Sequence, residues 1–377
     1  MVEWKKLGEV AKRNKGIPIT AGQMSELATP SGNVRVFAAG QTIADINEED
    51  LPANCAHKKP SVIVKSRGYI DFEFYEKPFT HKNEMWSYSF DNKQEGKFIY
   101  YFLTTQTDFF RNKAKANSVK LPQLCVADTD NYLIPIPSLS EQARIVGILD
   151  TFTSAIDNLK EQIAQRRKQY EYYRDQLLDL EGKPEVEMKT LGEVCDFIRG
   201  PFGGALKKDI FVSNGYAIYE QQHAIYGVWN FRYFIDENKY NQMKRFKVEA
   251  GDILMSCSGT MGKTSIVPYN YKEGIINQAL LKLSTKDDIS NKYLKQFMDS
   301  QLFQDALKGK TAGGAIQNVA SVSVLKDLTI PLPPLQEQQR IVSILDTFEA
   351  SIQNLEAQLK ERQKQYEYYR NKLLTFE

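Results

Sequence analysis

Residues 135–181 and 331–377 are two copies of one segment. They align without a gap at a constant offset of 196 residues, and 28 of the 47 aligned positions are identical. Two copies are too few for a solenoid, which needs at least three stacked repeats. The repeat therefore predicts a chain of two related halves with an approximate two-fold axis. We expect whatever it binds to be two-sided as well.

Each copy carries apolar and aromatic residues in alternating steps of four and three, with one slot filled by arginine. This period of 3.5 residues is typical of a coiled-coil seam. The seam consists of Ile145, Leu149, Phe152, Ile156, Leu159, Ile163, Arg166, Tyr170, Tyr173 and Leu177, and of Ile341, Leu345, Phe348, Ile352, Leu355, Leu359, Arg362, Tyr366, Tyr369 and Leu373. We predict two helices of about 40 residues, each roughly 60 Å long, that pair as an antiparallel coiled coil.

The ends of the first helix are also marked. Pro135 and Pro137 disfavour helix before it, Ser140 is the expected N-cap, and Gly182 with Pro184 stops it. Two alternatives stay open. Each helix could pack on its own globular domain instead of on the other helix, and the seam arginines either fix the register or extend to solvent.

Residues 1–134 and 185–330 are each the size of one domain and resemble each other weakly. VEWKKLGEV (2–10) matches VEMKTLGEV (186–194), SVIVKSRG (61–68) aligns with DILMSCSG (252–259), and KFIYYFLTTQ (97–106) aligns with KYLKQFMDSQ (292–301). The second domain has about a dozen extra residues before its SCSG loop. We predict strands at 62–64, 69–75, 253–255 and 264–267, and helices at 95–110 and 291–307. The fold class is therefore α+β, with two related domains alternating with two long helices.

Composition excludes several classes of protein. No run of residues is apolar enough for a membrane span, and the N-terminus does not read as a signal peptide. The four cysteines lack CxxC spacing, so neither a disulfide framework nor a zinc site is expected, and we predict a reducing cytoplasm. The net charge is +2, made up of +2 on each globular segment and −1 on each helical one. Positive charge therefore belongs to the globular domains.

Catalytic machinery is not recognisable. SGTMGKTS (258–265) looks like a phosphate loop, but Cys257 occupies the position where such a loop requires glycine. The three histidines share no spacing typical of a metal site or a catalytic triad, and no methyltransferase or dinucleotide-binding signature is present. We predict a protein that does not catalyse a reaction itself and holds no metal.

The helix-start motifs are the most specific pattern in the chain. They read IPIPSLSEQARIVGILD (134–150) and IPLPPLQEQQRIVSILD (330–346). With two diverged domains between near-identical helices, the whole chain resembles the specificity subunit of a Type I restriction–modification enzyme. The family pattern is Ile-x-Pro-Pro, two residues, Glu-Gln and an aliphatic run; Ser138 replaces the second proline in the first copy. The second domain also has the family-like GDILMSCSGTMGK (251–263) and INQ (276–278).

This resemblance implies four segments. Residues 1–134 and 185–330 would be target recognition domains, each reading one half of a bipartite site in double-stranded DNA. Residues 135–184 and 331–377 would be conserved helical spacers that set the gap between the half-sites and dock two methyltransferase subunits. Restriction subunits, which translocate DNA, would join them. The chain would hold no cofactor, and S-adenosylmethionine, ATP and Mg²⁺ would bind the partner subunits.

Polar loop residues are the candidates for DNA contact. Arg, Lys, Asn and Gln can bind base edges in pairs of hydrogen bonds, while Ser and Thr more often bind phosphates. In the first domain we expect Lys65, Arg67, Lys82, Asn83, Arg111, Lys113, Lys115 and Lys120. In the second we expect Gln221, Gln222, His223, Ser258, Thr260, Lys263, Asn277, Gln278, Lys308 and Lys310. An ordinary surface loop is the alternative for each residue, and Asn277 is also open to a structural role.

Two other functions would use the same architecture. One is a stand-alone two-headed DNA-binding protein, which would need tight binding without partner subunits. The other is a protein-binding scaffold with the helices as its hub. The Glu-Gln motifs, present twice at the helix starts, favour the specificity subunit.

Overall fold

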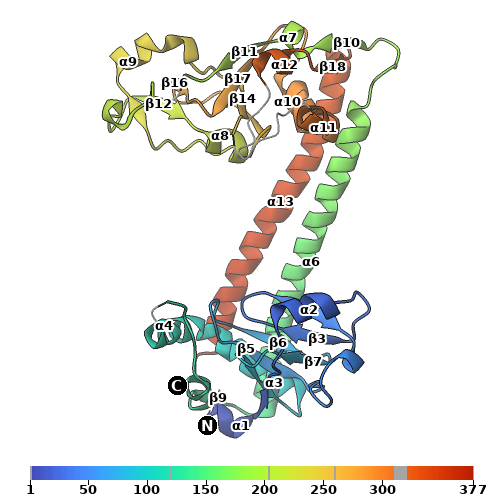
Figure 1. Cartoon of the computed structure of the whole chain (residues 1–377), viewed down its shortest axis with the longest axis vertical. Coiled ribbons are helices and arrows are strands. Elements are labelled where there is room, and N and C mark those ends of the chain that lie inside the picture. The colour runs from blue at the N-terminus through green and yellow to red at the C-terminus, as the bar shows by residue number, and fades with distance from the viewer. Residues whose placement is uncertain (1, 119, 203, 259, 310–320, 377) are drawn as a thin grey trace. The chain divides into compact units, whose positions relative to one another are not determined.

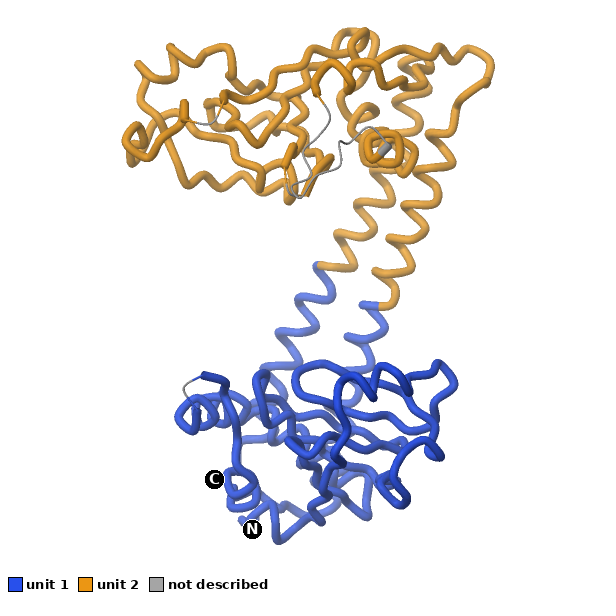
Figure 2. The backbone as a smooth tube through the Cα atoms, in the orientation of Figure 1, with its two compact units in different colours: residues 1–160, 357–377 blue, residues 161–356 orange. Residues whose placement is uncertain are grey.

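A computed structural model describes residues 2–118, 120–202, 204–258, 260–309 and 321–376 (Figure 1). The chain divides into two compact units, residues 1–160 with 357–377 and residues 161–356 (Figure 2). Both boundaries fall inside the long helices α6 (Leu139–Leu178) and α13 (Leu335–Leu373). Each unit therefore holds one globular domain and part of each long helix. Among the described residues, none of the helices has the length and apolar character needed to cross a membrane.

The first globular domain combines three small sheets with short helices. Its elements are β1 (Glu3–Lys6), α1 (Leu7–Val10), β2 (Lys12–Lys15), α2 (Ala21–Leu27), β3 (Val34–Phe37), β4 (Ile43–Ile46), β5 (Ser61–Lys65), β6 (Asp71–Tyr75), β7 (Phe79–His81), β8 (Trp86–Ser89), α3 (Lys93–Thr105), α4 (Thr107–Asn117), α5 (Val126–Asp130) and β9 (Leu133–Ile136). One sheet has the order β2-β8-β5-β6 and another the order β4-β3-β7, while β1 pairs with β9.

The second domain repeats this arrangement. Its elements are β10 (Glu187–Thr190), α7 (Leu191–Val194), β11 (Cys195–Arg199), β12 (Tyr216–Tyr219), α8 (Gln221–Tyr226), β13 (Phe234–Ile235), α9 (Glu237–Gln242), β14 (Ile253–Ser256), β15 (Thr264–Ile266), β16 (Gly274–Ile276), β17 (Leu280–Thr285), α10 (Asn291–Asp299), α11 (Gln301–Gly309), α12 (Val322–Lys326) and β18 (Thr329–Leu332). The sheet orders β11-β17-β14-β15, β13-β12-β16 and β10-β18 match those of the first domain strand for strand. The mixed helix and sheet fold predicted from the sequence is therefore confirmed.

The start of each long helix packs into the core of a domain. Ile145, Val146 and Leu149 are fully buried with the first domain's apolar residues. Ile341 and Leu345 are buried in the same way in the second unit. Val146 lies outside the predicted seam, so the apolar stripe widens where it faces a domain. Packing on a domain, which the sequence left open as an alternative, thus describes the helix starts.

Further along, the helices pack on each other. In the second unit, Arg167 forms an ion pair with Glu356, and Tyr173 stacks on Phe348. Positions rise along α6 while they fall along α13, so this pairing is antiparallel, as predicted. Arg166 lies over the Phe348 ring at 5.9 Å, and in the first unit Arg362 lies over the Phe152 ring at 5.8 Å. The seam arginines therefore cover aromatic rings of the opposite helix.

Two predicted helices are each divided into two. The predicted helix at 95–110 is α3 followed by α4, because Gln106 departs from helical geometry with ψ at 6°. The one at 291–307 breaks at Ser300, whose backbone is extended and whose hydroxyl accepts the Phe303 N–H at 3.3 Å. The predicted cap Ser140 is also wrong. α6 begins at Leu139, and the Ser138 hydroxyl accepts the Glu141 N–H at 3.3 Å.

Candidate nucleic-acid interface

Two parallel strand pairs place the candidate loops at equivalent edges of the two domains. β3 runs parallel to β7, and β12 runs parallel to β16. Parallel strands end at the same edge of a sheet, so the residues that follow them lie close together. The N–H of Lys82 donates to the carbonyl of Phe37 at 2.9 Å, and that of Asn277 donates to the carbonyl of Tyr219 at 3.0 Å. Lys82-Asn83 and Asn277-Gln278 are therefore the same loop in two domains.

A glycine brings a further loop against each of these edges. Gly16 follows β2, and a Cβ atom added there would overlap the carbonyl oxygens of His81 and Lys82. Gly200 follows β11, and an added Cβ atom would overlap the carbonyl oxygen of Asn277. Only glycine permits so close an approach. This close backbone contact is present in both domains, and it fixes the position of the loop that follows β7 or β16.

In the second domain, three predicted segments meet at this edge. The side-chain amide of Gln221 donates to the carbonyl of Ser258, which joins the start of α8 to the loop after β14. The N–H of Cys257 donates to the carbonyl of Ala279 at 2.9 Å, which joins that loop to the turn containing Asn277. Burial raises the pKa of the Cys257 thiol to about 11, so the thiol stays protonated beneath the loop.

Ser256, at the end of β14, holds residues 260 and 263 of the loop that follows. The Ser256 hydroxyl donates to the Thr260 carbonyl at 2.6 Å and accepts the Lys263 N–H at 3.1 Å. Thr260 and Lys263 are exposed, and Ser258 is half-buried. The Gln304 amide of α11 donates to the Gly262 carbonyl at 3.1 Å. The α11 that carries exposed Lys308 therefore lies against this loop.

In the first domain, fewer of the predicted residues lie together at the equivalent edge. The Ser66 hydroxyl donates to the carbonyl of Glu84, which brings the loop after β5 to the one after β7. The backbone of Arg67 forms an isolated antiparallel β-bridge with that of Gln123. Lys120, which is exposed, lies in the segment just before Gln123.

Arg111 joins this edge from α4. Its Nε donates to the Ile70 carbonyl at 3.2 Å, and its guanidinium lies 5.3 Å from the centre of the Tyr69 ring. Lys115 is exposed one helical turn further on the same face of α4. Lys113 instead points toward Asp128, with Nζ and Oδ1 4.0 Å apart, away from the face of Arg111.

Several candidates already have partners within the protein. Lys65 pairs with Glu73 at 2.8 Å and Lys82 with Glu84 at 3.2 Å, and both lysine side chains are less than one quarter exposed. The Asn277 side-chain oxygen accepts the Ala279 N–H at 3.0 Å, which supports its structural role. Asn83 and Gln278 are exposed at the same edges. Lys310 lies outside the described residues.

His223 differs from the other candidates because it is fully buried. Its Nδ1 accepts the Glu220 N–H at 2.8 Å, and its Nε2 donates to the Asn230 carbonyl at 3.1 Å. The ring stacks against Phe231 with centroids 4.8 Å apart. His223 thus holds the segment 220–231 together and stays out of reach of a ligand on the surface, while Gln221 and Gln222 beside it are half-buried.

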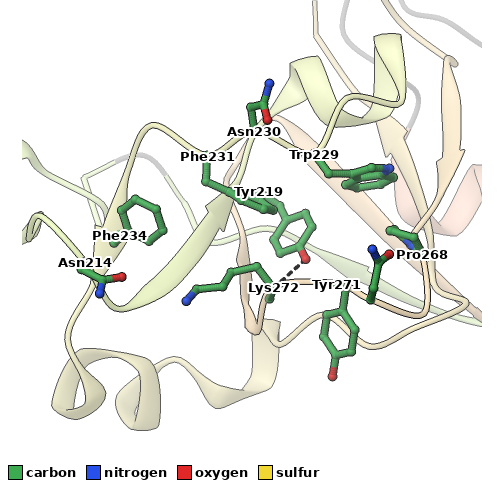
Figure 3. Close-up of a pocket in the computed structure, with 10 residues that line it drawn as sticks. Asn214, Tyr219, Trp229, Asn230, Phe231, Phe234, Pro268, Tyr271 and Lys272 are labelled. Carbon is green, nitrogen blue, oxygen red and sulfur yellow. Dashed lines mark hydrogen bonds between the residues drawn. The ribbon is translucent and has the colours of Figure 1, made fainter.

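The long connection of the second domain contributes Trp229, Asn230 and Phe231 to an aromatic pocket of about 520 Å³, which β12, β13 and the turn before β16 complete. Figure 3 shows Trp229, Phe231 and Phe234 along its wall and the Tyr219 hydroxyl pointing at the backbone of Lys272. That hydroxyl donates to the Lys272 carbonyl at 2.6 Å. The connection from β12 to β13 spans residues 220–233, whereas the one from β3 to β4 spans 38–42. The sequence signalled this insertion but not its shape.

Arg232, in the same connection, is a further candidate that is absent from the residues predicted from the sequence. It is exposed and forms two hydrogen bonds to the Glu220 carboxylate, at 2.7 and 3.1 Å. The carboxylate raises the pKa of the guanidinium further. Only the unusual length of the connection could have drawn attention to it. Among the described residues, no three His, Cys, Asp or Glu side chains are grouped so as to hold a metal ion.

Comparison with known proteins agrees with this architecture. The family model for the Type I restriction modification DNA specificity domain matches residues 1–166 and 183–364. The EcoR124I/EcoR124II specificity subunit of Escherichia coli is 30% identical over 397 residues, which cover 100% of this chain and 94% of that protein. The MjaVIII specificity subunit of Methanocaldococcus jannaschii is 24% identical over 299 residues, covering 74% of this chain and 69% of that protein.

A solved structure shares the fold. The S subunit of a Type I restriction–modification system from M. genitalium aligns with a TM-score of 0.60 at 17% identity, covering 100% of this chain and 97% of the other. The family model matches twice, once across each globular domain and most of the helix that follows it. The repeat, the strand-for-strand topology and these matches together show that the chain belongs to the specificity subunits of Type I restriction–modification enzymes, the non-catalytic subunits that recognise DNA.

Proposed function

We propose that each globular domain reads one half-site of a bipartite DNA target through the loop edge described above. In the first domain the edge comprises the loops after β5 and β7, with Arg111. In the second it comprises the start of α8 and the loops after β14 and β16. The observation that carries this proposal is the equivalence of Lys82-Asn83 and Asn277-Gln278, which follow the same parallel strand at the same hydrogen bond.

The equivalence is informative because the side chains differ while the backbone does not. A scaffold that reads two different half-sites must present different hydrogen-bonding groups at the same place. Lys and Asn stand in the first domain where Asn and Gln stand in the second. Asn and Gln can each form a pair of hydrogen bonds with adenine, while Lys contacts guanine. Exposed Asn83 and Gln278 are therefore the first base-reading candidates.

The paired helices serve a separate role in this proposal. They set the number of unread base pairs between the half-sites and dock two methyltransferase subunits, one for each copy of the repeat. Restriction subunits join this core. S-adenosylmethionine, ATP and Mg²⁺ bind to those partner subunits and not to this chain. A net charge of only +2 suits a subunit that shares its phosphate contacts with partners, because the number of contacts sets the electrostatic affinity.

A methylation map tests the function. The chain is co-expressed with its methyltransferase subunit, and the host DNA is sequenced for N6-methyladenine. We expect a split motif with a fixed gap of unspecified bases. Absence of new methylation, despite a stable complex and an active methyltransferase, would overturn the proposal. Tight and specific DNA binding by the isolated chain in such a case would point to the stand-alone binder.

Two substitutions assign the half-sites to the domains. Asn83→Ala should reduce base preference at one position of one half-site, and Gln278→Ala should do the same in the other half-site. In each case methylation of sites that carry a different base there should rise about tenfold, because one base-reading side chain is lost. Tyr269→Ala is the matched control, since Tyr269 is exposed on the turn before β16, at the opposite end of that strand. Relaxation of the same half-site by both variants would contradict the assignment.

A further inference from the structure

Arg232 is held in a single orientation although it lies on the surface. Its Nε donates to one Glu220 carboxylate oxygen at 3.1 Å, and its Nη2 donates to the other at 2.7 Å. The guanidinium also lies 5.5 Å from the centre of the Tyr233 ring. The side chain is nonetheless 62% exposed. A planar group fixed on one edge by a carboxylate presents its other edge to solvent.

The support under Arg232 is itself rigid. The Glu220 side chain is only 12% exposed, and its residue directly follows β12. Phe231 stacks on His223, and Tyr233 packs on Phe211 with ring centroids 4.7 Å apart. The residues on both sides of Arg232 thus contact neighbouring aromatic rings, and Arg232 between them points outward. Little conformational entropy remains for the arginine to lose when it binds a ligand.

Arg232 also lies close to the candidate interface. Glu220 immediately precedes Gln221 and Gln222, which open α8 at the candidate interface. The Gln222 amide lies 3.5 Å from a Glu220 carboxylate oxygen, and the Gln221 amide contacts the loop after β14. Arg232 is therefore attached to the same strand end as the predicted reading residues.

We propose that Arg232 reads a guanine in the half-site bound by the second domain. The inference deepens the proposed function and rests on it. An arginine side chain has five N–H donors, and the two bonds to Glu220 use one on Nε and one on Nη2. The remaining Nη1–Nη2 edge matches the O6 and N7 acceptors that guanine presents in the major groove. Glu220 thus positions the arginine through the edge that the base does not need.

Arg35 of the first domain provides a matched control. It forms the same two-bond contact, with Asp45 at 2.8 and 2.9 Å, and lies 5.6 Å from the Tyr75 ring. However, it joins β3 to β4 within the sheet, and its side chain is half as exposed, at 32%. Arg35→Lys should therefore affect the hairpin without changing the methylated sequence.

The experiment compares methylation motifs of the full chain, Arg232→Lys, Arg232→Ala and Arg35→Lys, each co-expressed with the methyltransferase subunit. We expect both Arg232 variants to relax one guanine position in one half-site, with at least tenfold more methylation at sites that carry another base there. All other positions should keep their preference. Lysine does not rescue, because it is a point charge without the two-donor edge. Glu220→Gln should weaken the preference for guanine at the same position, but by less than the Arg232 substitutions do.

Three results would overturn the inference. One is a wild-type motif with no guanine on either strand of the half-site that Gln278→Ala relaxes. The second is an unchanged motif in both Arg232 variants. The third is equally weaker methylation at every site, which would make Arg232 a phosphate contact or a folding residue; thermal unfolding of the purified variants separates these two. A wild-type chain that yields no bipartite motif would instead fail the proposed function itself.

Discussion

Phe152 of α6 stacks on Tyr369 of α13, with ring centroids 5.4 Å apart and ring planes at 26°. The offset of 196 residues converts this pair into Phe348 and Tyr173, which stack at 5.5 Å and 26° in the other unit. Each copy of the repeat thus contributes the phenylalanine to one stack and the tyrosine to the other. The sequence repeat is therefore also a repeat of side-chain contacts.

Removing one ring should weaken the helix pair. We expect Phe348→Ala to lower the free energy of unfolding by roughly 2 kcal/mol, because it removes the stack on Tyr173 and the surface covered by Arg166. Urea denaturation measures the change. Tyr226→Ala is the control, since Tyr226 is 73% exposed and lies on α8, outside the long helices. Equal effects of the two substitutions would show that the stack contributes nothing specific.

The two glutamines of the helix-start motifs should differ in importance. The Gln338 side chain accepts the Ser290 N–H at 2.8 Å and donates to the carbonyls of Asp288 and Pro333 at 3.0 and 2.9 Å. Gln142 donates to the Pro137 carbonyl at 3.0 Å, and its buried oxygen has no hydrogen-bond partner within the described part of the chain.

Gln338→Met should therefore destabilise the protein by about 2 kcal/mol, because it leaves buried backbone groups unpaired. Gln142→Met should cost less than about 1 kcal/mol, since it also removes an unsatisfied oxygen. Denaturant midpoints of the two variants, measured side by side, test the difference. A larger loss for Gln142→Met would contradict the reading of these contacts.

Mild acid should destabilise the first domain through His81. Burial, with a contribution from neighbouring His57, lowers the His81 pKa from 6.5 to about 4, while the Glu84 carboxylate opposes this shift. Between these two values the unfolded chain binds a proton that the folded chain excludes, so stability falls as pH decreases from 6.5. At pH 5 the loss is about 2 kcal/mol relative to pH 7.

Urea midpoints at pH 7 and pH 5 measure this loss. His57 adds to it in the same direction, because its burial lowers its pKa as well. His81→Gln should flatten the dependence, as glutamine does not titrate. Most carboxylates remain ionised at pH 5, so they contribute little in this window. An unchanged pH slope in the variant would show that other groups cause the effect.

Recognition should be sensitive to one methyl group at either edge glycine. We expect Gly200→Ala to weaken methylation at least tenfold, because the added Cβ atom displaces the backbone of Asn277 and with it Gln278. Gly147→Ala is the control. Nothing lies within 4 Å of its Cβ position, and alanine in a helix interior stabilises by about 1 kcal/mol. Gly200→Ala should therefore lower both the methylation rate and the thermal unfolding temperature, whereas Gly147→Ala should raise the unfolding temperature and leave the methylation rate unchanged.

The sequence predicts the parts of the fold that it states twice. Seam spacing repeats for nearly five heptads, and the motifs at 2–10 and 186–194 mark equivalent starts of both domains, so the helices and the common scaffold could be inferred. The breaks at Gln106 and Ser300 could not, because neither residue is a glycine or proline and the apolar pattern continues through both.

The candidate site was predictable only in part, for a related reason. Lys82 and Asn277 were found as polar loop residues, but their equivalence depends on parallel strand pairs that join residues more than 40 positions apart in sequence. His223 looked like a surface residue because its two buried hydrogen bonds are made to backbone atoms, which leave no sequence signal. Arg232 is a single charge without a pattern around it.

The contacts at Gly16 and Gly200 have a consequence for how such a protein can change. The loops after β7 and β16 are placed by main-chain hydrogen bonds and by a glycine that meets a carbonyl oxygen, and neither depends on the side chains of Asn83 or Gln278. Those side chains can be exchanged while the loop stays in position. Under the proposed function, a new sequence preference would arise by single substitutions at Asn83 or Gln278, without refolding the domain that carries them.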